Sequence, residues 1–191
     1  MPDASTLASA LILGNHNHRT AVAATLERFG AGALRYALDA AIRIRPLRKH
    51  EQYCAASAAL SRLGIDVDAW PAPPAGLFVV EERTVYLRSR SPMTVAHEFG
   101  HALDCALGGG VYRSGIDPVI RRLFANARSF VTPYAATGID EYFAEALRAY
   151  VEISDPASHW PRATKARLAT IDPDMLAYVE QLFRTDFSQA A

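Results

Sequence analysis

Two histidines four residues apart, with a glutamate directly after the first, are the residues of this sequence best suited to chemistry. They are His97, Glu98 and His101, in the segment TVAHEFGHALDCALGGG at residues 94–110. On an α-helix, residues four apart differ by about 40° around the axis and ~6 Å along it, so both imidazoles can face one ion. A catalytic zinc site takes three protein ligands and leaves a position for water. The pattern predicts that His97 and His101 bind Zn²⁺ and that Glu98 is the general base.

The residues around this motif favour a helix that could hold such a site. Ser91 and Pro92 are typical of a helix start, and the three glycines at 108–110 are typical of its end. Between them, apolar residues form a separate stripe for a core, namely Val95, Phe99, Ala102, Leu103 and Ala106. The alternative to a zinc site is that both histidines lie on the surface and bind no metal. Chance produces HExxH in a chain of this composition with odds of about one in a hundred.

The third ligand must come from elsewhere in the chain. The extended pattern HExxHxxGxxH fails, because Asp104 and Leu107 stand at its glycine and third-histidine positions. The later segment TGIDEYFAEALRAYVE, at residues 137–152, offers Glu141 and Glu145. Its start, with Thr137 three residues before Asp140, loosely resembles a capping box. Spacing alone favours a solvated helix face for the two glutamates, opposite the apolar stripe of Phe143, Ala146, Leu147, Tyr150 and Val151.

A resemblance changes that weighing. The blocks HEFGHALD and EYFAEALRAY resemble the catalytic domain of anthrax toxin lethal factor and its relatives, which include the bacterial Pro-Pro endopeptidases. The likeness spans roughly residues 41–151 and leaves out the other domains of lethal factor. It implies that Glu141 is the third ligand of one zinc ion per chain, as in a gluzincin. It also implies that Tyr134, seven residues before Glu141, donates a hydrogen bond to the oxyanion.

The same resemblance implies a substrate and how it binds. The segment GLFVVEERTVYLRS at residues 76–89 resembles the strand segment that forms one wall of the family's cleft. An edge strand there, with residues 84–87 as the candidate, would pair with an extended peptide or an unfolded protein loop. The predicted function is therefore a zinc-dependent endopeptidase.

Other polar residues have weaker assignments. Glu145 is a candidate to accept the far N–H of a ligating histidine and fix its tautomer. Asp104 could do the same, although an exposed carboxylate is the favoured interpretation. His16 and His18 lie too near a terminus to predict a second metal site, and Cys105 is interpreted as a small buried hydrophobe.

The order of predicted elements favours an α+β fold. Helical patterns occur in the second half of 16–30 and at 51–63, and strand patterns at 41–47, 77–80 and 84–87, before the motif helix. Helical patterns then follow at 117–127, 140–151, 163–168 and 174–183. We predict a single zincin-like metallopeptidase domain over 1–191. Its N-terminal lobe, about 1–107, holds a small mixed sheet and the active-site helix, and its C-terminal lobe, about 108–191, is all-helical.

Composition excludes several classes of partner. Twenty basic and twenty acidic residues give no net charge. The one short basic cluster, RIRPLRKH at 43–50, is interpreted as a strand with a solvated end, so nucleic acid is not expected. No apolar run approaches the roughly 20 residues of a membrane span, and the apolar residues 7–13 lack a preceding basic residue. We expect a cytoplasmic protein, with export by a leaderless route and the oligomeric state left open.

Two rival functions remain open from the sequence. A deformylase-like metallohydrolase would use HExxH with an upstream cysteine, for which Cys54 is the candidate. A catalytically silent zincin-fold module would bind without turnover, although such proteins commonly lose a ligand, the base or the tyrosine.

Overall fold

The computed structural model describes residues 2–14, 19–155, 158 and 161–187, so His16 and His18 lie outside the described residues. Three helices open the chain, and a strand and two short helices follow them. These elements are α1 (Ala4–Leu11), α2 (Arg19–Glu27), α3 (Gly30–Asp39), β1 (Arg43–Pro46), α4 (Tyr53–Ala56) and α5 (Ala58–Leu63). The sequence patterns predicted α2 and β1 but not α1 or α3. The predicted helix at 51–63 is broken because Ser57 caps α5, accepting a hydrogen bond from the Leu60 N–H.

The sheet has three strands in the order β1-β3-β2, with β2 (Gly76–Val79) and β3 (Thr84–Leu87) joined as a hairpin. β1 pairs parallel to β3, and β2 pairs antiparallel to it, so the sheet is mixed as predicted. The prediction that residues 84–87 form an edge strand is wrong, because β3 is the central strand and all four of its residues are buried. The edge strand on the hairpin side is β2, which packs against the motif helix.

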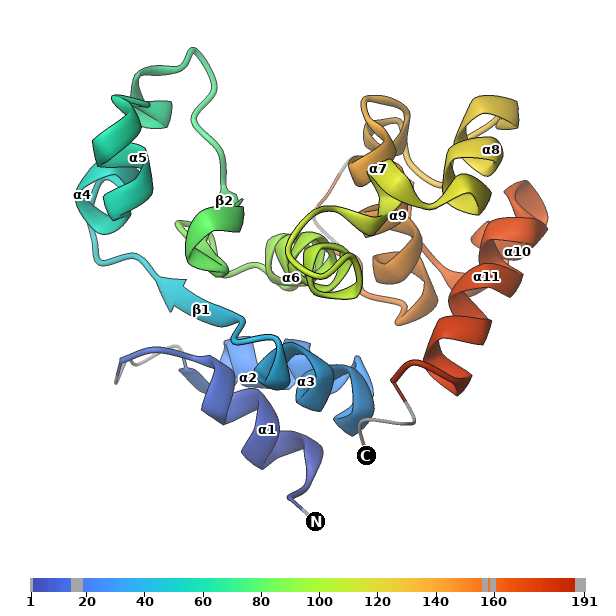
Figure 1. Ribbon diagram of the computed structural model, residues 1–191, viewed down its shortest axis with the longest axis horizontal. Coiled ribbons are helices and arrows are strands. Elements are labelled where there is room, and N and C mark those ends of the chain that lie inside the picture. Colours follow the sequence, from blue (N-terminus) through green and yellow to red (C-terminus); the bar gives the residue numbers. More distant parts are fainter. Residues whose placement is uncertain (1, 15–18, 156–157, 159–160, 188–191) are drawn as a thin grey trace.

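The HEFGH segment lies on α6 (Pro92–Leu107), near the middle of the molecule in Figure 1. Ser91 caps its first turn by accepting the Thr94 N–H, Pro92 is its first residue, and Gly108 is its C-cap, all as predicted. The helix contacts α2 and α3, β2 and β3, and the later helix α9, and it is buried over most of its length. Such packing fixes the direction of every side chain that α6 carries.

The second half of the described chain is helical, in agreement with the predicted α+β layout. Its helices are α7 (Arg113–Ile116), α8 (Pro118–Asn126), α9 (Ile139–Tyr150), α10 (Lys165–Ile171) and α11 (Pro173–Arg184), and they lie on one side of α6 in Figure 1. The predicted cap of α9 is wrong: Thr137 donates to the Tyr134 carbonyl, and Gly138 holds the N-cap position without a side-chain bond.

One cluster of buried side chains joins the two halves of the chain. It runs from Leu7 to Phe187 and includes Phe99 of α6 and Phe143 of α9. Phe99 meets Phe29 edge-to-face, with ring centroids 4.9 Å apart. Cys105 is buried in the same cluster, as predicted. Among the helices described, none has both the length and the apolar character needed to cross a membrane.

Candidate metal centre

α6 and α9 bring three candidate ligand atoms together. His97 Nε2 lies 3.1 Å from His101 Nε2 and 3.0 Å from Glu141 Oε2, and His101 Nε2 lies 3.2 Å from the same oxygen. With bonds of about 2.0–2.1 Å, tetrahedral zinc holds its ligand atoms roughly 3.3 Å apart, so this nearly equilateral triangle fits the ion. The donor set of two imidazoles and one carboxylate also suits zinc.

A close helix crossing makes this convergence possible. A Cβ placed on Gly100 would lie 3.0 Å from the Cα of Ala144, which is closer than most carbon contacts in proteins. The backbones of α6 and α9 can approach this closely because residue 100 has no side chain. Glu141 lies one turn before Ala144 on α9 and therefore reaches the imidazoles beside Gly100. The glutamates are not on a solvated face, which corrects the interpretation that spacing alone favours.

Glu145 holds the far side of His97. The His97 Nδ1–H donates to Glu145 Oε1 over 2.9 Å, which directs Nε2 toward Glu141 and His101, where an ion would lie. Arg148 donates to both oxygens of Glu145, from Nε over 2.8 Å and from Nη2 over 2.6 Å. Thr132 adds a hydroxyl donor 2.5 Å from Oε2. This four-donor arrangement fixes the Glu145 carboxylate and, through it, the ring of His97.

The Glu145–Arg148 pair is buried, with each side chain 3% exposed. Burial opposes the charge of Glu145, but hydrogen bonds from His97 and Arg148 outweigh it and hold the pKa of this carboxyl well below its usual range. Neither Arg148 nor Thr132 was predicted from the sequence. A signal existed for Arg148, because it follows Glu145 by three residues and the two side chains can therefore meet on a helix.

The candidate ligand residues shift one another's pKa values. Burial opposes a charge on His97, but hydrogen bonds to Glu141 and Glu145 outweigh it and raise the pKa of His97 to about 10. Burial likewise opposes the charge of Glu141, whereas hydrogen bonds from His101 and His97 lower its pKa to about 2. Glu141 therefore stays ionised across the neutral range, as a metal ligand must.

Glu98 lies between α6 and the edge strand. A Cβ on Gly76 would lie 2.5 Å from Glu98 Cγ, so only a glycine leaves room for this carboxylate. Burial raises the pKa of Glu98, and the charges of His97 and His101 only partly oppose that rise. A buried carboxylate with a raised pKa is a stronger proton acceptor than an exposed one, which suits the role predicted for it.

Tyr134 lies at the mouth of the site, with its hydroxyl donating to Glu141 Oε1 over 3.2 Å. Its ring centroid is 5.3 Å from that of His97, and 39% of the residue is exposed. Burial and the charge of Glu141 raise the pKa of Tyr134 above its usual value. The phenol therefore keeps its proton at neutral pH and can donate it in a hydrogen bond.

Asp104 does not face solvent, so that prediction is wrong. Its side chain is fully buried and accepts from Ser114, over 2.8 Å from the backbone N–H and 2.5 Å from the hydroxyl. Burial raises the pKa of Asp104 to about 6, against the opposing bonds from Ser114. Within the described chain, the buried Nδ1 of His101 has no hydrogen-bond partner, so Asp104 does not bond to that histidine.

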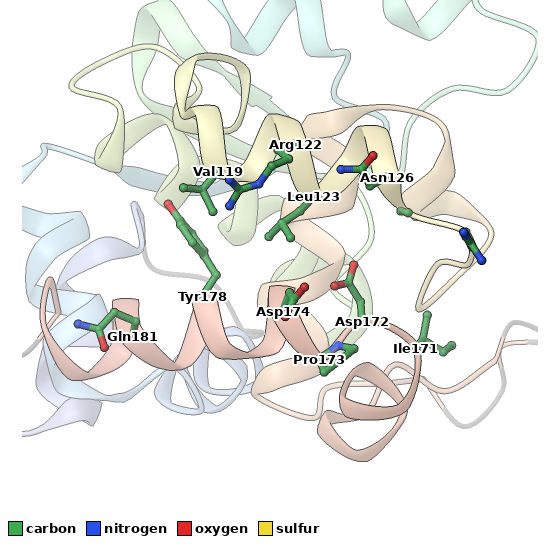
Figure 2. A pocket seen from close by; sticks show the side chains of 12 residues that line it. Val119, Arg122, Leu123, Asn126, Ile171, Asp172, Pro173, Asp174, Tyr178 and Gln181 are labelled. Carbon is green, nitrogen blue, oxygen red and sulfur yellow. The ribbon is translucent and has the colours of Figure 1, made fainter.

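A cavity of about 240 Å³ opens onto this centre. It is lined by His97, Glu98, Tyr134 and Met93 and by residues 74–76, which lead into the edge strand. Larger cavities lie elsewhere, including one of about 790 Å³ between α8 and α11 that contains none of the candidate site residues (Figure 2). Cys54 also lies elsewhere, grouped with Asp66 and Asp68 rather than with the two histidines.

The edge strand β2 turns some of its backbone groups away from the sheet, beside the cavity. The Arg88 N–H donates to the Ala75 carbonyl over 3.0 Å, in register with the pairs Leu77–Tyr86 and Val79–Thr84. Hydrogen-bonded and non-hydrogen-bonded pairs alternate in an antiparallel ladder, so Gly76 and Phe78 turn their N–H and C=O groups away from β3. The Phe78 N–H bonds to Glu98, and the other three groups lie along the edge of the sheet, where an extended chain can pair with a strand.

The α+β fold of this chain is also found in a peptidase of known structure. No protein-family model and no curated protein matches the sequence. A solved structure with the same fold is the PRO-PRO endopeptidase (PPEP-2) from Paenibacillus alvei, with a TM-score of 0.65 and 22% sequence identity. The match covers 92% of this chain and 99% of that chain. The predicted fold of the Pro-Pro endopeptidase type is thereby confirmed, whereas the resemblance to lethal factor stays a prediction.

Proposed function

We propose that this protein is a zinc-dependent endopeptidase of the gluzincin type. His97, His101 and Glu141 are the metal ligands, Glu98 is the general base, and Tyr134 stabilises the oxyanion. One observation carries the proposal: three candidate ligand atoms converge within 3.2 Å of one another, next to the buried Glu98. The likeness in fold to a Pro-Pro endopeptidase supports it.

The side chains divide the chemistry among them. Zinc, when bound, supplies a Lewis acid that polarises the scissile carbonyl and makes water more acidic. Glu98 takes the proton of the attacking water and passes a proton to the leaving amine. Tyr134 donates its hydroxyl hydrogen to the developing oxyanion, and Glu145 keeps the His97 ring in one tautomer.

The open edge of β2 sets how a substrate lies. A peptide that adds antiparallel to β2 would pair with the outward groups of Gly76 and with the Phe78 carbonyl, beside Glu98, which accepts the Phe78 N–H. Because pairing uses backbone groups, the peptide must be extended, so the substrate is a peptide or an unfolded loop of a protein. We expect this substrate in the cytoplasm unless a leaderless route exports the enzyme.

The two rival functions are weakened by the structure's geometry. A deformylase-like site needs Cys54 at the metal, and Cys54 lies in a different group of side chains. A silent binding module commonly lacks part of the machinery, whereas the ligands, the base and the tyrosine are all gathered here. Zinc binding with no turnover would nevertheless favour such a module.

Digestion of a peptide library tests the proposal. Wild-type protein should copurify with one zinc per chain and cleave internal peptide bonds. Glu98→Gln should keep the metal and lose turnover, because the base alone is removed. Cys54→Ser should keep both. Loss of zinc in Cys54→Ser with retention in Glu141→Ala would instead indicate the deformylase-like site.

A further inference from the structure

The short basic cluster of the sequence forms part of a groove that the proposed chemistry does not use. A cavity of about 750 Å³ follows the end of β1 and is lined by residues 47–52 with Asp68, Arg88 and Arg90. Arg48 and Lys49 are exposed at its rim. The turn that carries them is fixed, because Glu51 Oε2 accepts the Arg48 N–H over 2.8 Å.

The groove carries an excess of positive charge. Its two carboxylates are already engaged: Glu51 pairs with Arg45 over 2.7 Å, and Asp68 pairs with Arg88. Arg48, Lys49 and Arg90 form no ion pair with any carboxylate of the described chain.

Arg90 lines the groove and is fixed by a hydrogen bond to the backbone. Its Nη2 donates to the Leu47 carbonyl over 2.6 Å, and its Nε is buried without a partner in the part of the chain that the structure describes. Three cations are thus left without a balancing carboxylate in one groove, and a ligand that carries carboxylates would balance them.

Residues 74–75 connect this groove to the catalytic cavity. Ala75 lines the catalytic cavity, and its carbonyl accepts N–H groups from Arg88 over 3.0 Å and Ser89 over 2.7 Å. The preceding Pro74 carbonyl accepts the hydroxyl of Tyr53 over 2.9 Å, and the Arg88 guanidinium lies 4.6 Å from the centre of the Tyr53 ring. Residues 74–75 therefore contact the catalytic cavity on one side and a groove residue on the other.

The direction of substrate pairing connects the two cavities. A peptide antiparallel to β2 runs from the Val79 end of the strand to the Gly76 end, so its C-terminal part leaves past residues 74–76. Arg90 lies two residues before the start of α6, and Met93 of the catalytic cavity lies on the first turn of that helix. The exit of the catalytic cavity and the basic groove therefore lie at the same end of α6.

We propose that this groove, presented by Arg48, Lys49 and Arg90, binds acidic side chains that follow the cleaved bond of the substrate. The inference rests on the proposed endopeptidase function and adds a substrate class to it: peptides with Asp or Glu on the C-terminal side of the scissile bond. An acidic segment fits better than nucleic acid, because the unbalanced charge is confined to one short groove on a chain with no net charge.

Fluorescence anisotropy with the Glu98→Gln protein separates binding from turnover. Three labelled peptides share one cleavable core and carry Asp-Glu pairs after the core, Asp-Glu pairs before it, or the matching Asn-Gln pairs. At low salt the peptide with acids after the core should bind most tightly. Replacing two exposed cations, in Arg48→Gln/Lys49→Gln, should weaken only that peptide, by roughly three- to tenfold. Raising the salt should shrink the same advantage, because exposed pairs are screened.

A matched control removes two exposed arginines from the other lobe. Arg121→Gln/Arg122→Gln makes the same charge change on α8 and should leave all three affinities unchanged. The inference is overturned if acidic and amide peptides bind alike, if both double variants weaken binding equally, or if acids before the core give the advantage. It is also overturned if duplex DNA binds more tightly than the acidic peptide and loses that binding in Arg48→Gln/Lys49→Gln. Acid-dependent binding with no cleavage by wild-type protein would refute the endopeptidase while supporting the groove.

Discussion

Gly76→Ala should separate proton transfer from metal binding. Gly76 is the first residue of the edge strand β2. A Cβ added to it would lie 2.5 Å from Glu98 Cγ and 2.9 Å from Thr94 Cγ2. Carbon atoms rest about 3.5 Å apart or more, so the Glu98 side chain must move by roughly 1 Å. None of the three proposed ligands lies among the nearest atoms to this Cβ.

A displacement of this size has a large kinetic effect. A misplacement of about 1 Å can cost on the order of 100-fold in rate, which corresponds to ~2.7 kcal/mol of transition-state stabilisation. Crowding of this kind also costs about 1–3 kcal/mol of folding stability. We expect kcat/KM for a cleaved peptide to fall about 100-fold, with zinc content unchanged by elemental analysis.

Gly115→Ala is the matched control, because a Cβ there meets no atom within 4 Å. It should leave both activity and zinc content at wild-type levels. If Gly76→Ala cleaves peptides within about threefold of the wild-type rate, Glu98 is not confined as we describe. Equal loss of zinc and of activity would place Gly76 in support of the metal instead, and the reasoning would also fail.

Three further predictions test the remaining parts of the site. Glu141→Gln should lose zinc on dialysis while staying folded, whereas Glu98→Gln should retain it; equal retention measured by elemental analysis would exclude Glu141 as a ligand. Arg148→Met should lower the free energy of unfolding by about 3–5 kcal/mol, because it leaves Glu145 charged and buried, and should weaken zinc about 10–100-fold in a chelator competition. Unchanged zinc affinity in that variant would show that Arg148 does not act through Glu145. In metal-free protein, the pKa of Asp104 rises from 3.8 to about 6 on folding, so the folded chain keeps a proton that the unfolded chain has lost. The contribution of Asp104 to the free energy of unfolding should therefore fall as pH rises from about 4 to 6, by at most ~3 kcal/mol, and the difference between wild type and Asp104→Asn in denaturant titrations should show this slope.

The sequence predicted helix ends well, because residues next to one another in the chain determine where a helix starts and stops. The cap at Ser91, the proline after it and the glycines after Leu107 predicted α6 closely, because each satisfies or ends a helix by its own chemistry. Sheet order was not accessible in this way. Residues 84–87 read as a strand, but only the parallel pairing with β1, forty residues earlier, makes that strand central.

Burial of polar groups was the other limit of the sequence. Asp104 looked exposed because its partner, Ser114, lies beyond the turn at residues 108–110, and no helical spacing connects the two. Arg148 drew no prediction from the sequence, yet its side chain is 3% exposed and pairs with Glu145. Ser114 lies at a separation from Asp104 that no residue pattern reports. Arg148 and Glu145 do have helical spacing, and only their burial was not visible from that spacing.

The position of Glu141, the proposed third ligand, depends on a helix contact that spacing along the chain does not report. HExxH can orient two imidazoles on its own, but a glutamate from α9 reaches them only if the two helices nearly touch. Gly100, inside the motif, and Ala144, between Glu141 and Glu145, supply that contact. The same crossing positions Glu141 at the Nε2 atoms and Glu145 at the Nδ1 of His97. A larger side chain at either small residue would move both glutamates together, so the small residues matter to the proposed site as much as the proposed ligands do.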